Sequence, residues 1–492
     1  MPDGCERGEF LNRAAPAALL AFLAALGCMA LQANGIAAVI ALCLAPMLVF
    51  AVWKQQDVMI PAAFTALALL PFFLGVSRTP RIFFDEVLLL MLLAVVALQT
   101  FFGKIPLRLR GADVALALLC LALMALTMFY NKPSNMQLRS FIETFGLGTL
   151  LCLTMAQAST EKRMLRVAVC LAIAVSLISF AGIVESAARS NPLMEYVEKV
   201  AAVEFDFDFL YFSQEIMDLN NAIYRPYVIF FHPSEGGTFV GMCLPLIAVL
   251  LATGKYRKLA CVSLFLGAVF LLLNMTRGVW AACAITAFLF FPKVRRFSMF
   301  LIPVLLGALL LLLVFYADSP FVERLLNPKN LLIRFLFWET SWEYFLDHWL
   351  VGVGFYNFSE VYSASMAQAP AEAFSDAAGI ATVDNIFFMV LVEQGLLGLI
   401  GFVILLLLLL RRMLQSRKAL DDSGKHLPAH MVTAGLAGFS IFLFCGMMAD
   451  VHLFSKVTKL MFMSAGMAWG LGASQERQNV PGIYAVESGG KG

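Results

Sequence analysis

The sequence predicts an all-α, polytopic membrane protein with about fourteen transmembrane helices. Hydrophobic residues make up 61% of the 492 residues, and charged residues only 14%. Apolar runs of about twenty residues, the length at which a helix spans a bilayer, recur from one end of the chain to the other. Most of these runs are separated by short connections, which favours one helical bundle over several soluble domains.

The predicted spans are closely spaced except around two long polar loops at about 187–235 and 317–385. They lie at about 14–33, 36–53, 58–75, 84–102, 113–130, 139–157, 164–186, 236–253, 258–274, 278–292, 297–316, 386–410, 430–447 and 455–472. The first is expected to be a retained helix, because the segment before it is not net basic as a signal peptide requires. Residues 1–473 are therefore expected to form a single transmembrane domain, and the polar segment 474–492 a flexible tail.

Basic residues mark every second connection between the predicted spans. They occur at Lys54, Lys104 to Arg110, Lys162 to Arg163, Lys255 to Lys258, Lys293 to Arg296 and from Arg411 onward. Because cytoplasmic loops hold the excess of Lys and Arg, both termini are expected in the cytoplasm and both long loops outside it. Only Arg78 and Arg81, in a short outer turn, depart from this pattern.

The second long loop is expected to contain an amphipathic helix that opens at Arg334. Five aromatic residues recur at alternating spacings of three and four on one face, and three acidic residues occupy the other: Phe335, Trp338, Trp342, Phe345 and Trp349, against Glu339, Glu343 and Asp347. This pattern is typical of a helix that lies flat at a membrane surface, where Trp is favoured. Ser341 and His348 follow Arg334 at sevenfold spacing, so these three residues are predicted to share one side of the helix.

Three arginines lie beside predicted membrane ends and are candidates for binding a phosphate. Arg225 could grip a phosphate with its planar fork or serve as a snorkelling anchor. Arg277 lies in a tight turn with Gly278, where an arginine near hydrocarbon is costly unless it meets a carboxylate or a phosphate. Arg334 opposes the dipole at a helix start, so helix stability alone does not explain it.

Other polar residues in the outer loops and spans have alternative interpretations. His232 and Glu235 stand just before a span, in the segment HPSEGG. Glu393, inside a span, either lines a cavity or pairs with another helix. Asp206 and Asp208 form a D-x-D pair that could hold a divalent metal. An interfacial aromatic segment is favoured there, because nucleotide sugars are not expected outside the cytoplasm.

At these positions the chain resembles the O-antigen ligase and O-antigen polymerase (Wzy-type) superfamily. Four features carry the resemblance over about residues 220–412. They are the Arg225 segment leading to HPSEGG, the TRG turn at Arg277, the R-x3-W start at Arg334 followed by DHWLVGVGFYNF, and Asp384-Asn385 followed nine residues later by Gly395-Leu396-Leu397-Gly398.

The resemblance implies an integral membrane glycosyltransferase at the periplasmic face of the bacterial inner membrane, using neither a metal nor another cofactor. Its donor would be a glycan on undecaprenyl diphosphate, and its acceptor a sugar hydroxyl on another glycan or on a lipid core. Membrane lipids, a chain-length regulator and a flippase are the implied partners, and no nucleic acid is involved. Family arginines matching Arg225, Arg277 and Arg334 are thought to bind the diphosphate and help it to leave. Asn385 and Trp338 are further candidates for contacting the substrate.

One departure from the family pattern concerns the catalytic base. The last motif of ligases usually begins His-Asn, and Asp384 stands at the place of that histidine. A carboxylate, with a usual pKa near ~3.9, is a weaker base than imidazole at ~6.5. Either the surroundings of Asp384 make it a stronger base, or His232, Glu235 or His348 takes the proton instead.

The missing histidine favours a polymerase of repeat units for an exopolysaccharide, a capsule or O-antigen. A ligase that transfers glycan to lipid A-core is the alternative. A lipid-linked glycan flippase or other transporter would show the same hydropathy, but transporters tend to have repeated halves and ionisable groups on broken mid-membrane helices. A further alternative is an inactive relative that binds glycan, because Asp384 replaces the expected base.

Overall fold

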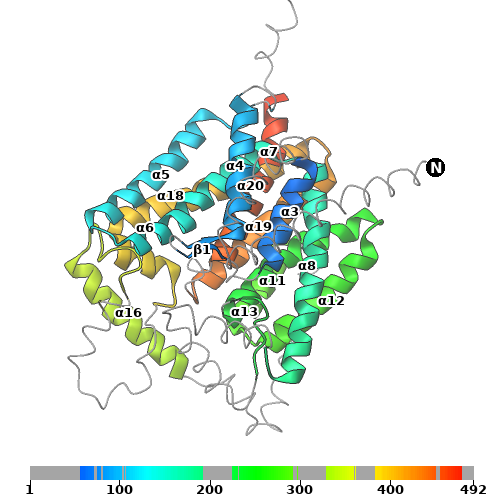
Figure 1. The fold of residues 1–492 in the computed structure, drawn as a ribbon. Coiled ribbons are helices and arrows are strands. Elements are labelled where there is room, and N and C mark those ends of the chain that lie inside the picture. The colour runs from blue at the N-terminus through cyan, green and yellow to red at the C-terminus, as the bar shows by residue number, and fades with distance from the viewer. Residues whose placement is uncertain are drawn as a thin grey trace, which may run out of the picture.

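The computed structural model describes residues 56–70, 75–78, 81–101, 107–191, 224–230, 232–291, 329–358, 383–449 and 455–478, and the single residues 105, 296 and 361. The regular elements among these residues are helices, apart from one two-stranded hairpin (Figure 1). Seven helices among them are long and apolar enough to cross a membrane. Six are α5 (Gly111–Tyr130), α8 (Glu161–Ala188), α11 (Pro233–Ala248) with its 3-10 extension to Thr253, α12 (Arg257–Asn274), α18 (Ile386–Asp422) and α19 (His426–Gly446). The seventh, Gln137–Ala158, is continuous through most of α6 (Asn135–Phe141), the π-helix Ile142–Leu147 and α7 (Gly148–Ala158). A multi-pass membrane protein is therefore confirmed.

Three shorter apolar helices coincide with further predicted spans. They are α3 (Gln56–Leu69), α4 (Phe84–Phe101) and α13 (Arg277–Phe290). The predicted span at 58–75 was too long, because α3 ends at Leu69 and strands β1 (Gly75–Arg78) and β2 (Arg81–Phe83) follow. Pro71 disfavours helical backbone in the residue before it, which accounts for the early end. The predicted spans at 14–33, 36–53 and 297–316 lie outside the described residues, so the total of fourteen stays a prediction.

Helix α20 (Ser455–Gln478) lies at the centre of the bundle (Figure 1). Every residue from Lys456 to Ala473 is buried, and the helix contacts α7, α18 and α19. Added Cβ atoms on Gly466 and Gly470 would lie 2.2 and 2.1 Å from the carbonyl oxygens of Cys152 and Ala156 in α7. Small residues four apart let helix backbones approach closely, as in many membrane helix pairs.

The two ends of the bundle carry different groups of residues. Helix α8, with 28 residues, is roughly 42 Å long. Near its start, Arg108 bonds to the Ser159 carbonyl and Arg412 pairs with Asp113, so three of the predicted basic connections gather at one end. The Arg225 segment contacts its other end. Which end faces the cytoplasm stays a prediction.

Helix α18 is interrupted at Gly395, whose backbone is not helical (φ 65°, ψ −168°). The break removes hydrogen bonds within the helix, and the loop 349–354 replaces them. The N–H groups of Val353 and Gly354 donate to the carbonyls of Val392 and Glu393, and Leu396 N–H donates to the Trp349 carbonyl. The positive φ and the close backbone approach both require glycine at position 395, where a Cβ would lie 2.4 Å from the Leu350 carbonyl. The GVG and QGLLG motifs therefore form one packed unit.

Candidate functional site

The Arg225 segment, the start of α11 and the α12–α13 turn are joined by the buried side chain of Asn274. Its amide N–H groups donate to the carbonyls of Pro226 (2.9 Å) and Pro233 (2.8 Å). Its backbone carbonyl accepts the Arg225 Nε–H at 2.9 Å. Sequence reasoning missed Asn274, although an asparagine at the very end of an apolar span was a signal that could have drawn attention to it.

Replacing Asn274 with alanine is expected to destabilise the protein by about 2–4 kcal/mol, because two buried carbonyls would each lose a donor. Thermal unfolding of the purified protein in detergent measures this. Replacing Thr433 with alanine is a matched control, because the buried Thr433 hydroxyl bonds only within its own helix, to Ala429. An equal Tm for both variants would contradict a joining role for Asn274.

Glu185 fixes the backbone just after Arg225. Its carboxylate accepts the Tyr224 hydroxyl (2.8 Å) and the N–H groups of Tyr227 (3.1 Å) and Val228 (2.8 Å). Val228 has a left-handed backbone (φ 54°), which is unfavourable for a β-branched residue. Asn191 donates to the Val228 carbonyl, so side chains from the end of α8 and just beyond it hold both backbone groups of the strained residue. Arg225 is thereby held in place from two sides.

His232 caps the start of α11. Its Nδ1 accepts the Ser234 N–H at 3.1 Å, which requires a ring without a proton on that nitrogen. Burial and, to a smaller extent, the positive charge of Arg225 together lower the pKa of His232 to about 3. Near neutral pH the ring is therefore an uncharged cap whose Nε2 carries the proton, which is a poor arrangement for a general base.

Replacing His232 with asparagine is expected to keep most of the activity, because an Asn side chain also accepts the N–H of a cap. The pKa of His232 lies below its usual 6.5, so the unfolded chain binds this proton first as the pH falls. Its contribution to stability is complete above about pH 6.5 and shrinks toward pH 3. Thermal unfolding between pH 7 and pH 4 should therefore fall less steeply in His232→Asn than in the wild type. His426→Asn, at the start of α19, should behave like the wild type, and an inactive His232→Asn that unfolds normally would assign His232 a direct role.

Arg277 is the first residue of α13, and its turn is bonded to Arg225. Arg225 donates to the Thr276 hydroxyl at 3.0 Å, and that hydroxyl donates to Asn274 Oδ1. Thr276 stands at the N-cap position of α13 but makes no side-chain cap bond. The helix start adds its own partial positive charge to that of Arg277. The structure therefore bonds the predicted residue Arg225 to the turn that carries Arg277, through Thr276.

Arg334 lies on a different element and pairs with Asp384. Its Nε donates to Asp384 Oδ2 at 2.9 Å, and both side chains are about one-third exposed. Helix α16 begins at Lys329, so the prediction that Arg334 opens the helix was wrong. Asp384 has a positive φ of 52° and directly precedes Asn385. The ion pair between two residues that were both predicted for the site was not anticipated.

Asn385 caps α18 and links the two parts of the site. Its Oδ1 accepts the N–H groups of Phe387 and Phe388, and its Nδ2 donates to the Met447 carbonyl at 3.4 Å. Met448 lies against Gly278, where an added Cβ would be 3.5 Å from the Met448 Cβ. The Asp384 and Arg277 segments therefore meet at the end of α19. Helices α11, α13 and α18 all begin at this end of the bundle.

The face by which α16 packs differs from the predicted aromatic face. Trp338 donates its indole N–H to the Val383 carbonyl (2.8 Å) and stacks on Phe388. Residues of this buried side are Phe337, Trp338, Ser341, Tyr344 and Phe345. Phe335, Trp342 and Trp349 are exposed, which is compatible with a membrane surface. Trp338 thus joins α16 to the Asp384 segment, and its role toward substrate stays a prediction.

His348 and Glu235 are the two other candidates for the base. Helix α16 ends at Asp347, and His348, just beyond it, is exposed whereas Ser341 is fully buried, so the two residues have different surroundings. Glu235 is buried in the first turn of α11. Asp206 and Asp208, the D-x-D pair considered for a divalent metal, lie outside the described residues.

A buried ionic cluster, which sequence reasoning also missed, is connected to the Arg225 segment through Phe230. Lys459 in α20 pairs with Glu143 (3.2 Å) and Glu86 (3.5 Å). Lys456, one turn earlier, lies 5.2 Å from the centre of the Phe230 ring. That ring packs on Gly236 at the start of α11. Two lysines within an apolar span were the available signal, because ionisable residues inside a membrane are costly and pair with one another.

One comparison with known proteins finds a matching family. Residues 262–403 match a family model described as O-antigen ligase (Wzy_C). The matched segment includes Arg277, Arg334 and the Asp384–Asn385 pair, and Arg225 lies before it. The search of curated proteins gives no match. The family carries out membrane glycan transfer of the ligase or polymerase type. The predicted resemblance is confirmed for residues 262–403, which are similar to the O-antigen ligase family and lie within a multi-pass membrane protein.

Proposed function

We propose that the protein is a Wzy-type polysaccharide polymerase of the bacterial inner membrane. It transfers a glycan from undecaprenyl diphosphate to a sugar hydroxyl of a second glycan at the periplasmic face. The observation that carries the proposal is the bonded network of Arg225 and the Arg277 turn, next to the Arg334–Asp384 pair, at an end of the bundle where three helices begin. Guanidinium groups and helix N-termini both favour a diphosphate.

In the proposed reaction, the acceptor hydroxyl attacks the anomeric carbon of the donor glycan. The bond between that carbon and the phosphate oxygen breaks, and undecaprenyl diphosphate leaves. Arg225, Arg277 and Arg334 stabilise the negative charge that grows on the leaving oxygen. The activated diphosphate supplies the driving force, and no metal ion or nucleotide takes part.

Asp384 accepts the proton of the attacking hydroxyl in this proposal. While it pairs with Arg334, protonation of the carboxylate would sacrifice the ion pair. A bound diphosphate offers Arg334 a stronger, doubly charged partner, which releases Asp384 to act as the base. Donor binding thereby switches on the base.

A ligase is the second candidate, because the matching family model is described as O-antigen ligase. The aspartate at the position of the ligase histidine favours the polymerase.

Electrophoresis of surface glycans from a deletion strain separates the two activities. Single repeat units still attached to lipid core are expected for a polymerase, whereas undecorated core with long lipid-linked chains would identify a ligase. Complementation with the wild-type gene should restore the normal pattern, and an Arg277→Ala gene should not. An unchanged glycan pattern in the deletion strain would overturn both assignments.

A further inference from the structure

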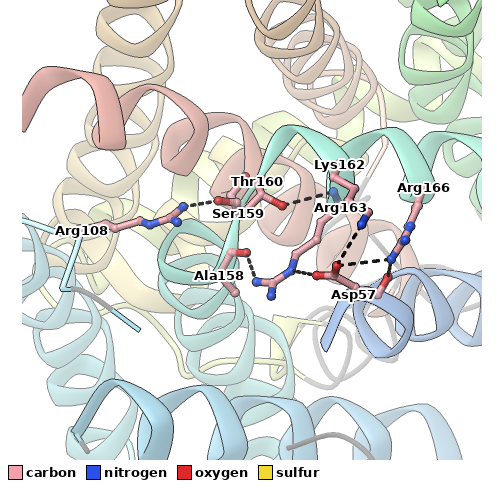
Figure 2. A network of polar contacts seen from close by, with 8 residues as sticks. All are labelled: Asp57, Arg108, Ala158, Ser159, Thr160, Lys162, Arg163 and Arg166. Carbon is pink, nitrogen blue, oxygen red and sulfur yellow. Dashed lines mark hydrogen bonds and ion pairs between the residues drawn. The ribbon is translucent and has the colours of Figure 1, made fainter. Parts of the chain in front are cut away.

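A cluster of cations surrounds Asp57 at the end of the bundle opposite the candidate site (Figure 2). Arg163 Nε donates to Asp57 Oδ1 at 2.8 Å. On Oδ2, Arg166 approaches to 3.5 Å and Lys162 to 3.8 Å. Asp57 is the second residue of α3, and the three cations lie in the first two turns of α8, so the cluster joins two helices at their starts.

The cations of this cluster outnumber its carboxylate. Arg108 adds a fourth cation, whose guanidinium donates to the Ser159 carbonyl (Figure 2). Desolvation and the nearby charge of Arg163 both lower the pKa of Arg108, as expected for crowded like charges. A helix start carries partial positive charge and disfavours cations, yet Lys162, Arg163 and Arg166 all lie there. An anion at this position would relieve both effects.

The cation cluster around Asp57 is exposed on one side. The Lys162 side chain is 68% exposed, whereas those of Arg166 and Arg163 are only 22% and 16% exposed. Arg163 is therefore the structural partner of Asp57, and its second donor group bonds to the Ala158 carbonyl at 2.6 Å. Lys162 is the most exposed of the cations, and the partly exposed Arg166, which also donates to the Asp57 backbone carbonyl at 2.9 Å, is the second group that an external anion could reach.

An apolar stripe on α8 continues directly from the two reachable cations. It begins one helical repeat beyond Arg166, on the same face of the helix, and its members are 47–61% exposed: Ile173, Leu177, Phe180 and Val184. Because α8 is long enough to cross a bilayer, this stripe faces the depth of the hydrocarbon. Cations at the head of an exposed apolar stripe match a molecule with a negative head and an apolar tail.

We propose that this surface of α8 binds an anionic phospholipid. The headgroup phosphate contacts Lys162 and Arg166, and an acyl chain lies along Ile173, Leu177, Phe180 and Val184. A free phosphate would use the cations but gain nothing from the stripe. The lipid would neutralise the excess charge and hold α3 and α8 together at their starts, independently of any glycan chemistry at the other end.

The test is native mass spectrometry of the full-length protein in detergent, titrated with dioleoylphosphatidylglycerol or dioleoylphosphatidylcholine. We expect tighter binding of the phosphatidylglycerol. The double variant Lys162→Gln/Arg166→Gln should lower the affinity for phosphatidylglycerol on the order of tenfold or more, because each of the two lost cations contributes severalfold to the attraction of an anionic lipid. The affinity for phosphatidylcholine should not change. Arg163 is kept so that Asp57 retains its closest partner, and a single cooperative thermal unfolding transition verifies that the double variant is folded.

The matched control is Arg257→Gln/Lys258→Gln, which removes two cations from the exposed start of α12. It should keep most of the phosphatidylglycerol binding. Equal losses in both double variants, or no loss in the first, would overturn the proposal. Displacement of the lipid by millimolar inorganic phosphate would also overturn it, because the site would then recognise phosphate alone.

Discussion

Replacing Arg277 with alanine is expected to abolish polymer formation while the protein still inserts and folds. Arg277 is the first residue of α13, and its turn is bonded to Arg225 through Thr276. Loss of a positioned group that stabilises charge in a transition state costs about 10²- to 10³-fold in rate. The measurement is the yield and length of surface glycan in a complemented deletion strain, with protein abundance in the membrane determined by immunoblot.

Arg257→Ala is the matched control for this prediction. Arg257 is also the first residue of a membrane helix, but it is exposed at the start of α12, far from the candidate site. It should therefore retain normal polymer. Arg277→Lys keeps the charge and loses the planar fork, so an intermediate yield is expected. Normal chain length and yield in Arg277→Ala would remove this arginine from the site.

Periodicity and charge in the sequence were sufficient to predict most of the helices that the structure describes. Apolar length places the spans because a helix must satisfy its own backbone in the membrane. The same reasoning failed after Leu69, where a hairpin follows α3. It also did not predict the break at Gly395, because the loop that satisfies the freed backbone groups lies more than forty residues earlier in the chain.

The candidate site was predictable in its residues but not in their partners. Arg225 and Arg277 could be singled out because arginines beside a membrane are costly. Asn274, which accepts the Arg225 Nε–H, and Glu185, which holds the backbone just after Arg225, belong to other helices, so no local pattern links them to Arg225. For α16, the sequence indicated an aromatic face. The packed face also contains Ser341, because contact with α18 determines which side is buried.

The Asp384–Arg334 pair leads to the second large prediction. Replacing Asp384 with asparagine is expected to lower the rate of transfer about 10²- to 10⁴-fold, the usual contribution of general base catalysis. The substitution removes the negative charge of the ion pair with Arg334 but keeps the size of the side chain and its hydrogen bond. Asn accepts the Arg334 Nε–H as Asp does, and it tolerates the positive φ of 52° at this position. The measurement is the initial rate of polymerisation of a purified undecaprenyl-diphosphate repeat unit.

Two further variants separate a base from a residue that only positions Arg334. Histidine also tolerates a left-handed backbone and can accept a proton, so Asp384→His should retain much of the activity that Asp384→Asn loses. Asp384→Ala should lose both the base and the partner of Arg334. If Asp384→Asn instead kept nearly full activity while Asp384→His and Asp384→Ala were equally impaired, the carboxylate would serve only to hold Arg334. The proton would then have to leave through another group, and because the Nδ1 of His232 is occupied as a helix cap, His348 or Glu235 would be the next residue to test.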